Sequence, residues 1–420
     1  MSAVPNVSEI PLARIELVLD QFMAWLQQYG ETSWDYQTYF ASPLGGWAKG
    51  LYYRNRLLGT VAVSPMIFSE AFVPSARRFF APRFRFPIAD AHYAMGFAFL
   101  AQARGDSSLH ARAVHFLEEL EDERCSGYKH RCWGYPFDWE TVTGTVHQGT
   151  PLITTTPYVY EAFREVYQLD ADVRWREAMA CIAQHAAEDI KDYPVSKTAW
   201  SSAYSPFEKK GGVVNASAYR AFLLTCASTD LNEDRYWTIA ERNLNFVLEA
   251  QRPDGSWYYS VDGIRDFVDH FHTCFVLKAL AKIDQLKPTA KSWKAITKGI
   301  EYYITNLFTE SALPKPFSKR PRMTVYRREL YDYAECINLC ILLRDRIPSL
   351  DRVLKCVLDD LLTRWIKPDG SFRSRELWLG WDNVPMHRWA QSQMFRGLAL
   401  LALQERGACA AIRTVQFQTQ

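Results

Sequence analysis

The chain has 420 residues, of which 48% are hydrophobic, so it is long enough to bury one large core. Its 49 basic and 47 acidic residues give a formal net charge of +2, which provides no field to hold a polyanion, so no nucleic acid is expected as a partner. The nine cysteines have no regular spacing and the N-terminus has no basic region followed by an apolar run, which predicts reduced thiols and a cytoplasmic location.

The first strongly apolar stretch of the chain, residues 57–73, is too short and too interrupted to span a bilayer. It follows two tyrosines and two arginines within residues 52–56, and a basic aromatic collar beside an apolar run is typical of a helix at a membrane interface. Two interpretations stay open. The more common one is a helix packed on the outside of the main domain, and the other is peripheral contact of residues 51–73 with the inner membrane.

Six apolar helical segments then recur along the chain at spacings of roughly 55 to 65 residues. They begin at Asp90, Thr155, Asn215, His270, Leu330 and His387. Amphipathic helices with one charged face lie between them, and residues 8–29 are expected to supply the sixth of this second set. An inner ring of nearly all-apolar helices inside an outer ring predicts an all-α fold, the (α/α)6 toroid of six helical hairpins.

This pattern divides the chain into three parts. We expect residues 1–85 to form an N-terminal helix and an extended segment that pack on the toroid, residues 86–410 to form the toroid, and residues 411–420 to be a C-terminal tail. Loops rich in Trp, Tyr, Pro and Gly precede the inner helices, and the tetrapeptide PDGS occurs at Pro253 and again at Pro368. A rigid scaffold usually carries its function on such loops, so the mouth of the ring is the expected site.

The first of these PDGS loops carries a resemblance to a known repeat. Residues 251–257, with Gln251 and Trp257, resemble the QW element of the prenyltransferase and squalene-cyclase repeat, and residues 369–372 are a degenerate copy. The resemblance implies a terpene-cyclase-like enzyme as one alternative. The acidic DxDD and DDxxD motifs of such enzymes are missing, which makes this alternative the least favoured.

From about Ala41 onward the chain is similar to (α/α) toroid proteins encoded in bacterial exopolysaccharide and capsule biosynthesis clusters. The segments SPLGGWAKGLYYRNRLLG and FPIADAHYAMGF carry this resemblance. Six-hairpin glycosidases, toroidal polysaccharide lyases and uronyl C5-epimerases share the scaffold, and the sequence AQSQ at residues 390–393 is similar to the AQGQ element of the epimerases. The resemblance implies an enzyme that acts on an oligosaccharide or polysaccharide.

The strongest candidate for chemistry is the segment IRDFVDHFHTCF, which contains Asp266, Asp269, His270 and His272. Residues three and four apart are neighbours on a helix, so positions 266, 269 and 270 are expected to share a face, while His272 points elsewhere. Removal of a proton beside a uronic carboxylate needs a base, and histidine titrates in the working range. The alternative is that Asp266 caps the helix and the histidines make core hydrogen bonds.

A second candidate is Asp138, which lies between Trp133 and Trp139 with His147 close by in sequence. Desolvation by the tryptophans would raise the pKa of this carboxyl group and suit it to general acid catalysis, as in a glycosidase. The alternative is an ordinary solvated or helix-capping carboxylate.

The same stretch offers a weak metal motif. Its members are Cys125, His130, Cys132 and His147. Their spacing matches no known zinc finger, so we predict no metal and no cofactor.

A third group lies on the later inner helices, where Tyr331 and Asp382 are further catalytic candidates. In toroidal lyases and epimerases a tyrosine, a histidine or asparagine, and an arginine act together, and the resemblance implies Asn215, His272, Tyr331 and Arg388 for this set. The alternative for Arg388 is a structural ion pair with an acid such as Asp382. The complete set of expected substrate-binding residues is Trp133, Trp139, His147, Tyr204, Asn215, Trp257, Trp381, His387, Arg388 and Gln391.

These features favour a carbohydrate-active enzyme of bacterial polysaccharide biosynthesis. It would process an acidic glycan or a lipid-linked oligosaccharide in the toroid cleft by hydrolysis, elimination or C5 epimerisation. The main alternative is a noncatalytic glycan-binding or assembly protein.

Overall fold

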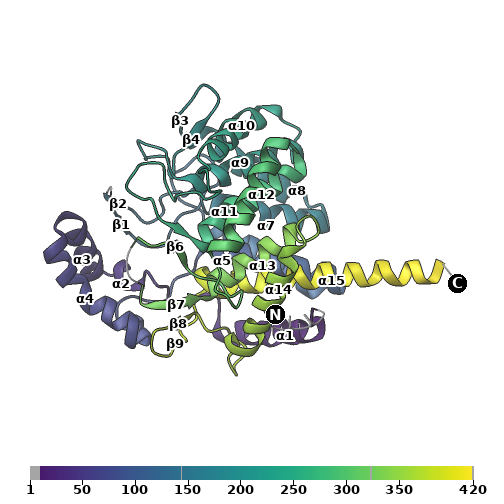
Figure 1. Cartoon of the computed structure of the whole chain (residues 1–420), viewed down its shortest axis with the longest axis horizontal. Coiled ribbons are helices and arrows are strands. Elements are labelled where there is room, and N and C mark those ends of the chain that lie inside the picture. The colour runs from purple at the N-terminus through teal and green to yellow at the C-terminus, as the bar shows by residue number, and fades with distance from the viewer. Residues whose placement is uncertain (1–9, 143, 322–323, 419–420) are drawn as a thin grey trace.

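Helices make up most of the structure, and short strands gather on one side of it (Figure 1). The computed structural model describes residues 10–142, 144–321 and 324–418, with side chains as far as Gly407. Residues 1–9 of the predicted N-terminal part and residues 419–420 of the predicted tail lie outside the described residues.

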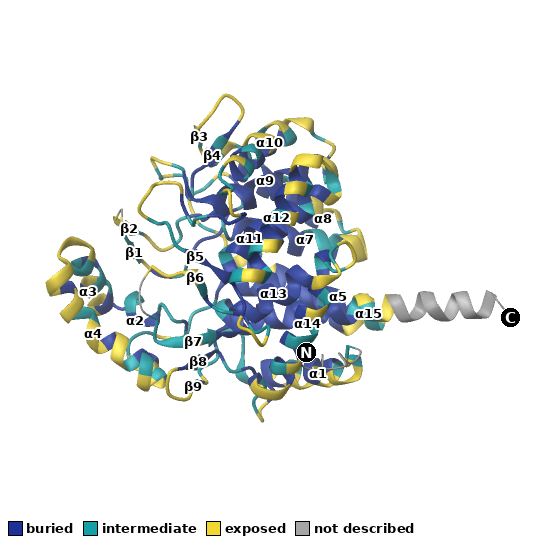
Figure 2. Ribbon diagram, in the orientation of Figure 1, coloured by how far each residue is buried: buried dark blue, intermediate teal, exposed yellow. Residues whose placement is uncertain are grey.

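The inner ring is a closed circle in which each helix packs against the next and the last packs against the first. Its members in chain order are α5 (Pro87–Arg104), α7 (Thr156–Asp170), α9 (Val214–Asp230), α11 (His270–Leu286), α13 (Leu330–Leu343) and α15 (Ser392–Gln418). In α9 every residue from Val214 to Ser228 is buried, as expected for a helix that is covered on all sides. Figure 2 shows these helices as the buried centre of the molecule.

The outer ring surrounds the inner one, and each of its helices packs mainly on one inner helix. Its members are α1 (Leu12–Tyr29), α6 (Ser107–Asp122), α8 (Val173–Gln184), α10 (Asp234–Glu249), α12 (Ala290–Asn306) and α14 (Ser349–Asp360). Helix α1 packs on α15, so the N-terminal helix completes the sixth hairpin. The predicted all-α (α/α)6 toroid is therefore confirmed.

The amphipathic pattern of the outer helices explains how the two rings fit. In α14 the buried residues recur at helical spacing and are Leu350, Val353, Leu354, Val357 and Leu358. Single π-helical turns extend α8 (His185–Asp189) and α14 (Leu361–Trp365), and a third (His387–Gln391) precedes α15.

Short antiparallel strands lie where the inner helices begin, and they form the mouth of the toroid (Figure 1). The pairs are β1 (Trp139–Thr141) with β2 (Gly144–Val146), β3 (Asp192–Pro194) with β4 (Trp200–Ser202), and β5 (Val268–Asp269) with β6 (Phe317–Lys319). A three-stranded sheet contains β7 (Tyr326–Glu329), β8 (Arg375–Leu377) and β9 (Trp381–Asp382). Strand β5 leads directly into α11, and β7 leads into α13.

The two PDGS elements adopt the same turn. Asp254 accepts a hydrogen bond from the backbone N–H of Ser256 at 3.0 Å, and Asp369 accepts the equivalent bond from Ser371 at 3.0 Å. In the first copy Gly255 has a φ of 94°, and a Cβ there would lie 2.5 Å from the backbone oxygen of Lys298. Only glycine fits such a turn pressed against an outer helix, which explains the repeated sequence.

Residues 38–79 project from the toroid as a separate feature, which we call the arm (Figure 1). It contains α2 (Thr38–Ala41), α3 (Pro43–Arg54), α4 (Arg56–Phe72) and a 3₁₀ turn (Pro74–Phe79). A Cβ on Gly59 would lie 2.0 Å from the Cα of Tyr52, so α3 and α4 pack backbone to backbone. None of the described helices combines the length and the apolar character needed to cross a membrane.

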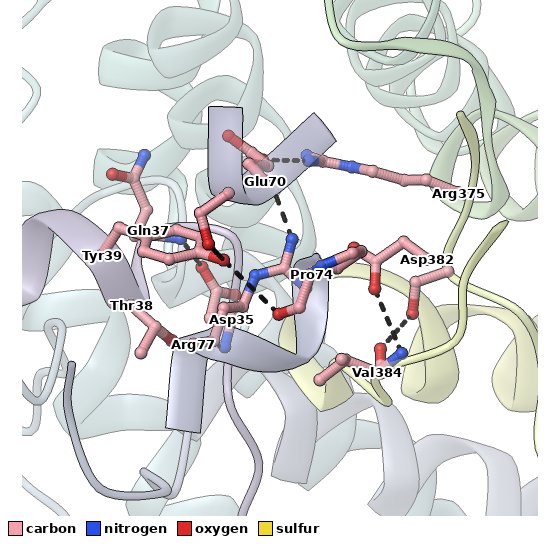
Figure 3. Close-up of polar contacts among 12 residues, drawn as sticks. Asp35, Gln37, Thr38, Tyr39, Glu70, Pro74, Arg77, Arg375, Asp382 and Val384 are labelled. Carbon is pink, nitrogen blue, oxygen red and sulfur yellow. Dashed lines mark hydrogen bonds and ion pairs between the residues drawn. The ribbon is translucent and has the colours of Figure 1, made fainter. Parts of the chain in front are cut away.

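Buried ion pairs attach the arm to the three-stranded sheet (Figure 3). The guanidinium of Arg77 lies 2.7 Å from Asp382, and Glu70 accepts a hydrogen bond from Arg375 at 2.6 Å. Asp382, a predicted catalytic residue, is fully buried in this contact. The structure therefore gives Asp382 a structural partner on the arm, away from the inner-ring residues described next.

Candidate active site at the mouth of the toroid

Asp269 and His272 form a hydrogen-bonded pair at the start of α11. Asp269 is the N-cap of the helix, and its carboxylate accepts hydrogen bonds from the backbone N–H of His272 at 2.9 Å and from the His272 Nδ1 at 2.6 Å. A carboxylate only accepts, so Nδ1 carries the proton. The Asp269 side chain is buried, while that of His272 is 22% exposed. This leaves Nε2 as the basic nitrogen of the ring.

A small cavity of about 10 Å³, roughly the space of one water molecule, lies beside this pair. Its lining includes Asn215, Trp257, Tyr259, Phe267, Asp269 and His272. The Oδ1 of Asn215 is buried and has no hydrogen-bond partner among the described residues. The ring of Tyr259 packs edge-on against His272, with centroids 4.7 Å apart. Four predicted residues thus meet at one place: Asp269 at the end of β5, His272 in α11, Asn215 in α9 and Trp257 in the first PDGS loop.

Aromatic side chains extend from this cavity across the inner ring. Tyr331 stacks on Trp389 with centroids 4.3 Å apart and an interplanar angle of 7°. Phe275 links them to His272, since its ring lies 5.4 Å from His272 and 5.9 Å from Tyr331. Burial raises the pKa of Tyr331 well above its ordinary value, so the hydroxyl stays protonated. Sequence reasoning did not single out Phe275 or Trp389.

Arg388 is buried next to this aromatic group, but its charge is already paired. Its guanidinium donates two hydrogen bonds to Asp35, at 3.0 and 2.7 Å, and one to the hydroxyl of Tyr135 at 3.1 Å. Burial alone would lower the pKa of Arg388, but Asp35 holds it well above its ordinary range. Arg388 therefore does form a structural ion pair, but its partner is Asp35 and not Asp382, which binds Arg77.

His270 and His387 point away from the centre of the ring. His270 donates from Nδ1 to the Leu307 carbonyl at 3.2 Å and accepts at Nε2 from the Tyr303 hydroxyl at 2.7 Å. His387 donates from Nε2 to the Gly30 carbonyl at 3.0 Å. Burial lowers the pKa of each to about 3, so both rings are neutral. Their partners lie on or beside other helices, which indicates structural roles.

These two neutral histidines should make the protein sensitive to acid. Their folded pKa of about 3 is below the ordinary value of 6.5, so the unfolded chain binds more protons and stability falls as pH drops from 6.5 towards 3. At about pH 4.5 each histidine should cost roughly 3 kcal/mol. Urea unfolding would measure the free energy of unfolding of the wild type and of His387→Gln at both pH values. The difference between the two proteins should be smaller at about pH 4.5 than at neutral pH, by about this amount. A gap for His387→Gln that stays the same at both pH values would contradict the argument.

Two predicted catalytic carboxylates, Asp266 and Asp138, are exposed to solvent. Asp266 precedes α11, which begins at His270, so the prediction that positions 266, 269 and 270 share a helical face is wrong. Strand β5 occupies the intervening residues, and Asp266 pairs with Lys319.

Asp138 is also exposed, at 59% of its side chain, and lies 3.5 Å from the exposed His147. Trp133 is buried elsewhere and donates to the Leu120 carbonyl at 2.6 Å. The desolvation predicted for Asp138 is therefore absent.

The remaining predicted sugar-binding residues occupy three different settings. Trp139 and Tyr204 lie near each other at the mouth, with centroids 6.5 Å apart. Trp381 packs edge-on against Trp365 of the outer ring at 5.1 Å. Gln391 is buried and clamps the backbone of Phe372 through both its amide atoms, at 3.0 and 2.8 Å.

Cys125 and Cys132 of the weak metal motif lie beside each other, but the two histidines of the motif bind other partners. His130 pairs with Asp189 at 3.0 Å, whereas His147 lies beside Asp138. The described side chains that do lie close enough together to share an ion are Glu31, His115 and Glu119. Glu31 already forms ion pairs there with Arg85 at 2.8 Å and Arg112 at 2.5 Å, so its negative charge is neutralised.

A buried network of charges fills the centre of the inner ring, and sequence reasoning missed it. Lys278 of α11 pairs with Glu335 of α13, and Lys282 pairs with Glu161 of α7. Arg396 of α15 lies 5.5 Å from the centroid of the Tyr158 ring. The sequence does contain a signal for this network, because two lysines lie four residues apart in an otherwise apolar helix. A buried charge of this kind needs a partner of opposite charge.

No known protein family and no curated protein matches the chain. Solved structures resemble it in fold. The cellobiose 2-epimerase from Bacillus thermoamylovorans B4167 is 8% identical with a TM-score of 0.60, covering 76% of this chain and 88% of that one. A D-mannose isomerase is 12% identical with a TM-score of 0.59, covering 96% and 100%. A polysaccharide lyase is 10% identical with a TM-score of 0.58, covering 96% and 99%. At these identities the likeness shows the toroid fold alone.

Proposed function

We propose that this protein is a carbohydrate-active enzyme of bacterial polysaccharide biosynthesis that removes a proton from an acidic glycan, with His272 as the base. The observation that carries the proposal is the Asp269–His272 pair at the cavity, since its geometry fixes the Nδ1 proton and leaves Nε2 basic. Asp269 also stabilises the imidazolium that forms when Nε2 takes the proton. Solved structures with a similar fold include an epimerase, an isomerase and a lyase as well as glycoside hydrolases, so the choice of proton transfer rests on the residues of the site.

Elimination or C5 epimerisation fits this site better than hydrolysis. Glycoside hydrolysis ordinarily uses two carboxyl groups on either side of the bond that breaks. Among the described residues that line the cavity, Asp269 is the one carboxylate, and it is committed to His272. Proton removal next to a uronic carboxylate needs one base and one proton donor, and Tyr331 is a protonated hydroxyl on the same aromatic surface.

The cavity has room for about one water molecule, so the sugar ring is proposed to lie across the mouth above His272. Trp389, which is partly exposed and stacks on the buried Tyr331, offers apolar surface for a sugar ring, and the unpaired Oδ1 of Asn215 can accept a hydroxyl hydrogen bond. Arg388 is assigned a positioning role, because Asp35 already neutralises it.

Incubation with uronate-containing and neutral oligosaccharides in D₂O tests this proposal. Epimerisation is expected to place deuterium on the carbon next to the carboxylate, detected by NMR, and elimination to give an unsaturated sugar that absorbs ultraviolet light. Release of reducing ends without either signal would instead indicate hydrolysis. Binding without any conversion would indicate a noncatalytic glycan-binding protein.

A further inference from the structure

The arm carries an apolar stripe that the rest of the described chain leaves uncovered. Leu57, Val61, Phe68 and Phe72 of α4 are 78%, 70%, 64% and 54% exposed. Their spacing of four, seven and four residues places them on one face of the helix. Contiguous apolar surface of this kind is rare on a soluble protein and marks a place where something binds.

The opposite face of α4 already packs against the rest of the protein, so the helix cannot rotate to bury the stripe. Met66 is buried there, Gly59 lies against the backbone of Tyr52, and Glu70 pairs with Arg375. The ion pair between Arg77 and Asp382 fixes the end of the arm to the sheet (Figure 3). The stripe is therefore held outward by contacts on the other side of the same helix.

The exposed charges on the arm are positive. Arg54, Arg56 and Arg78 are exposed, and among the described residues none of them lies within ion-pair distance of a carboxylate. Arg56 instead lies over the ring of Tyr52 at 4.8 Å. The one acidic residue of the arm, Glu70, is buried and paired. The exposed charges that the arm itself carries thus have one sign, although the whole chain is nearly neutral.

The arm lies on the side of the molecule that also carries the strands of the mouth. Figure 1 shows α3 and α4 beyond β1 and β2, on the opposite side from the C-terminal end, and Figure 2 shows the exposure of both helices. Helices α2 and α3 contact β1. A flat surface bound by the arm would consequently lie near the mouth.

We propose that the arm binds an anionic lipid membrane, with the stripe inserted among the headgroups and acyl chains and the three arginines on the lipid phosphates. An apolar face of Leu, Val and Phe bordered by arginine is the composition that interfacial helices need. Anionic headgroups supply the complementary charge. A second copy of the chain is less suitable as the occupant, because a two-fold pairing of arms would bring like charges together.

Sedimentation of the full chain with lipid vesicles tests this proposal. Vesicles of phosphatidylcholine containing phosphatidylglycerol are expected to bind the protein, and pure phosphatidylcholine vesicles to bind it much less. The triple variant Leu57→Ser, Val61→Ser, Phe68→Ser should lower the binding at least about tenfold. The triple variant Arg54→Gln, Arg56→Gln, Arg78→Gln should weaken the binding and remove its dependence on salt.

A matched control replaces three apolar side chains that are equally exposed but lie outside the arm. Val173→Ser, Val195→Ser and Ile264→Ser together should leave vesicle binding unchanged. All of these side chains are exposed, so thermal unfolding should be the same for every variant. Equal binding of the stripe variant and the wild type would overturn the proposal, as would no binding to phosphatidylglycerol vesicles. A dimer in light scattering that the stripe variant abolishes would also overturn it in favour of self-association.

Discussion

Replacing His272 with glutamine is expected to lower kcat by about 10²- to 10⁴-fold, the usual contribution of a general base. Glutamine keeps a polar side chain at a partly exposed position, so the fold should tolerate the change. Steady-state kinetics on the substrate found in the D₂O experiment, together with a thermal unfolding curve, would separate lost chemistry from lost structure.

Asp269→Asn is the companion variant for this prediction. Asparagine is as good an N-cap as aspartate, so α11 should still form, but its side chain no longer stabilises a positive charge on His272. We expect kcat to fall, because the imidazolium that forms when Nε2 takes the proton loses the carboxylate that stabilises it. The surface histidine variant His110→Gln should behave as wild type. Full activity in His272→Gln would show that another group is the base.

Replacing Lys278 with methionine is expected to lower the free energy of unfolding by about 3–5 kcal/mol. Both partners of this ion pair are buried between α11 and α13, and the change leaves the carboxylate of Glu335 in the core without a counterion. Urea unfolding monitored by circular dichroism would measure the loss.

A double variant shows whether the unpaired charge is the cause. Lys278→Met with Glu335→Leu removes both charges and should recover most of the lost stability, because an apolar pair of similar size can replace a buried ion pair. The matched control is Lys355→Met, which breaks the partly exposed pair with Asp351 and should cost no more than about 1 kcal/mol. A similarly small loss in Lys278→Met would mean that Glu335 takes up a proton or finds another partner.

The fold was predictable because its signal is local and repeated. The buried positions of α14 follow one another at helical spacing, and each hairpin repeats an apolar helix and an amphipathic one. The contact between Asp269 and His272 is also local, because the side chain of an N-cap residue accepts a hydrogen bond from the backbone N–H three positions later.

Contacts between distant parts of the chain could not be predicted in this way. Asp35 and Arg388 are 353 residues apart and meet only because the N-terminal segment reaches the last inner helix. His270 and His272 are two residues apart, yet one faces an outer helix and the other the mouth. Which of two such neighbours faces the substrate depends on the rotation of the helix, and packing against other helices sets that rotation.

The way the toroid closes has a consequence for its folding during synthesis. The seam of the ring joins α15 to α5, and the ring of Phe395 packs there against Phe97 at 4.9 Å and occupies the space beside Gly96. About 290 residues separate the end of α5 at Arg104 from the start of α15 at Ser392. The apolar face of α5 therefore stays without its packing partner until translation is nearly complete. Such a late, long-range contact is slow to form and exposes an aggregation-prone surface in the meantime. A chain truncated before α15 would therefore be a substrate for chaperones and proteases instead of a smaller, folded toroid.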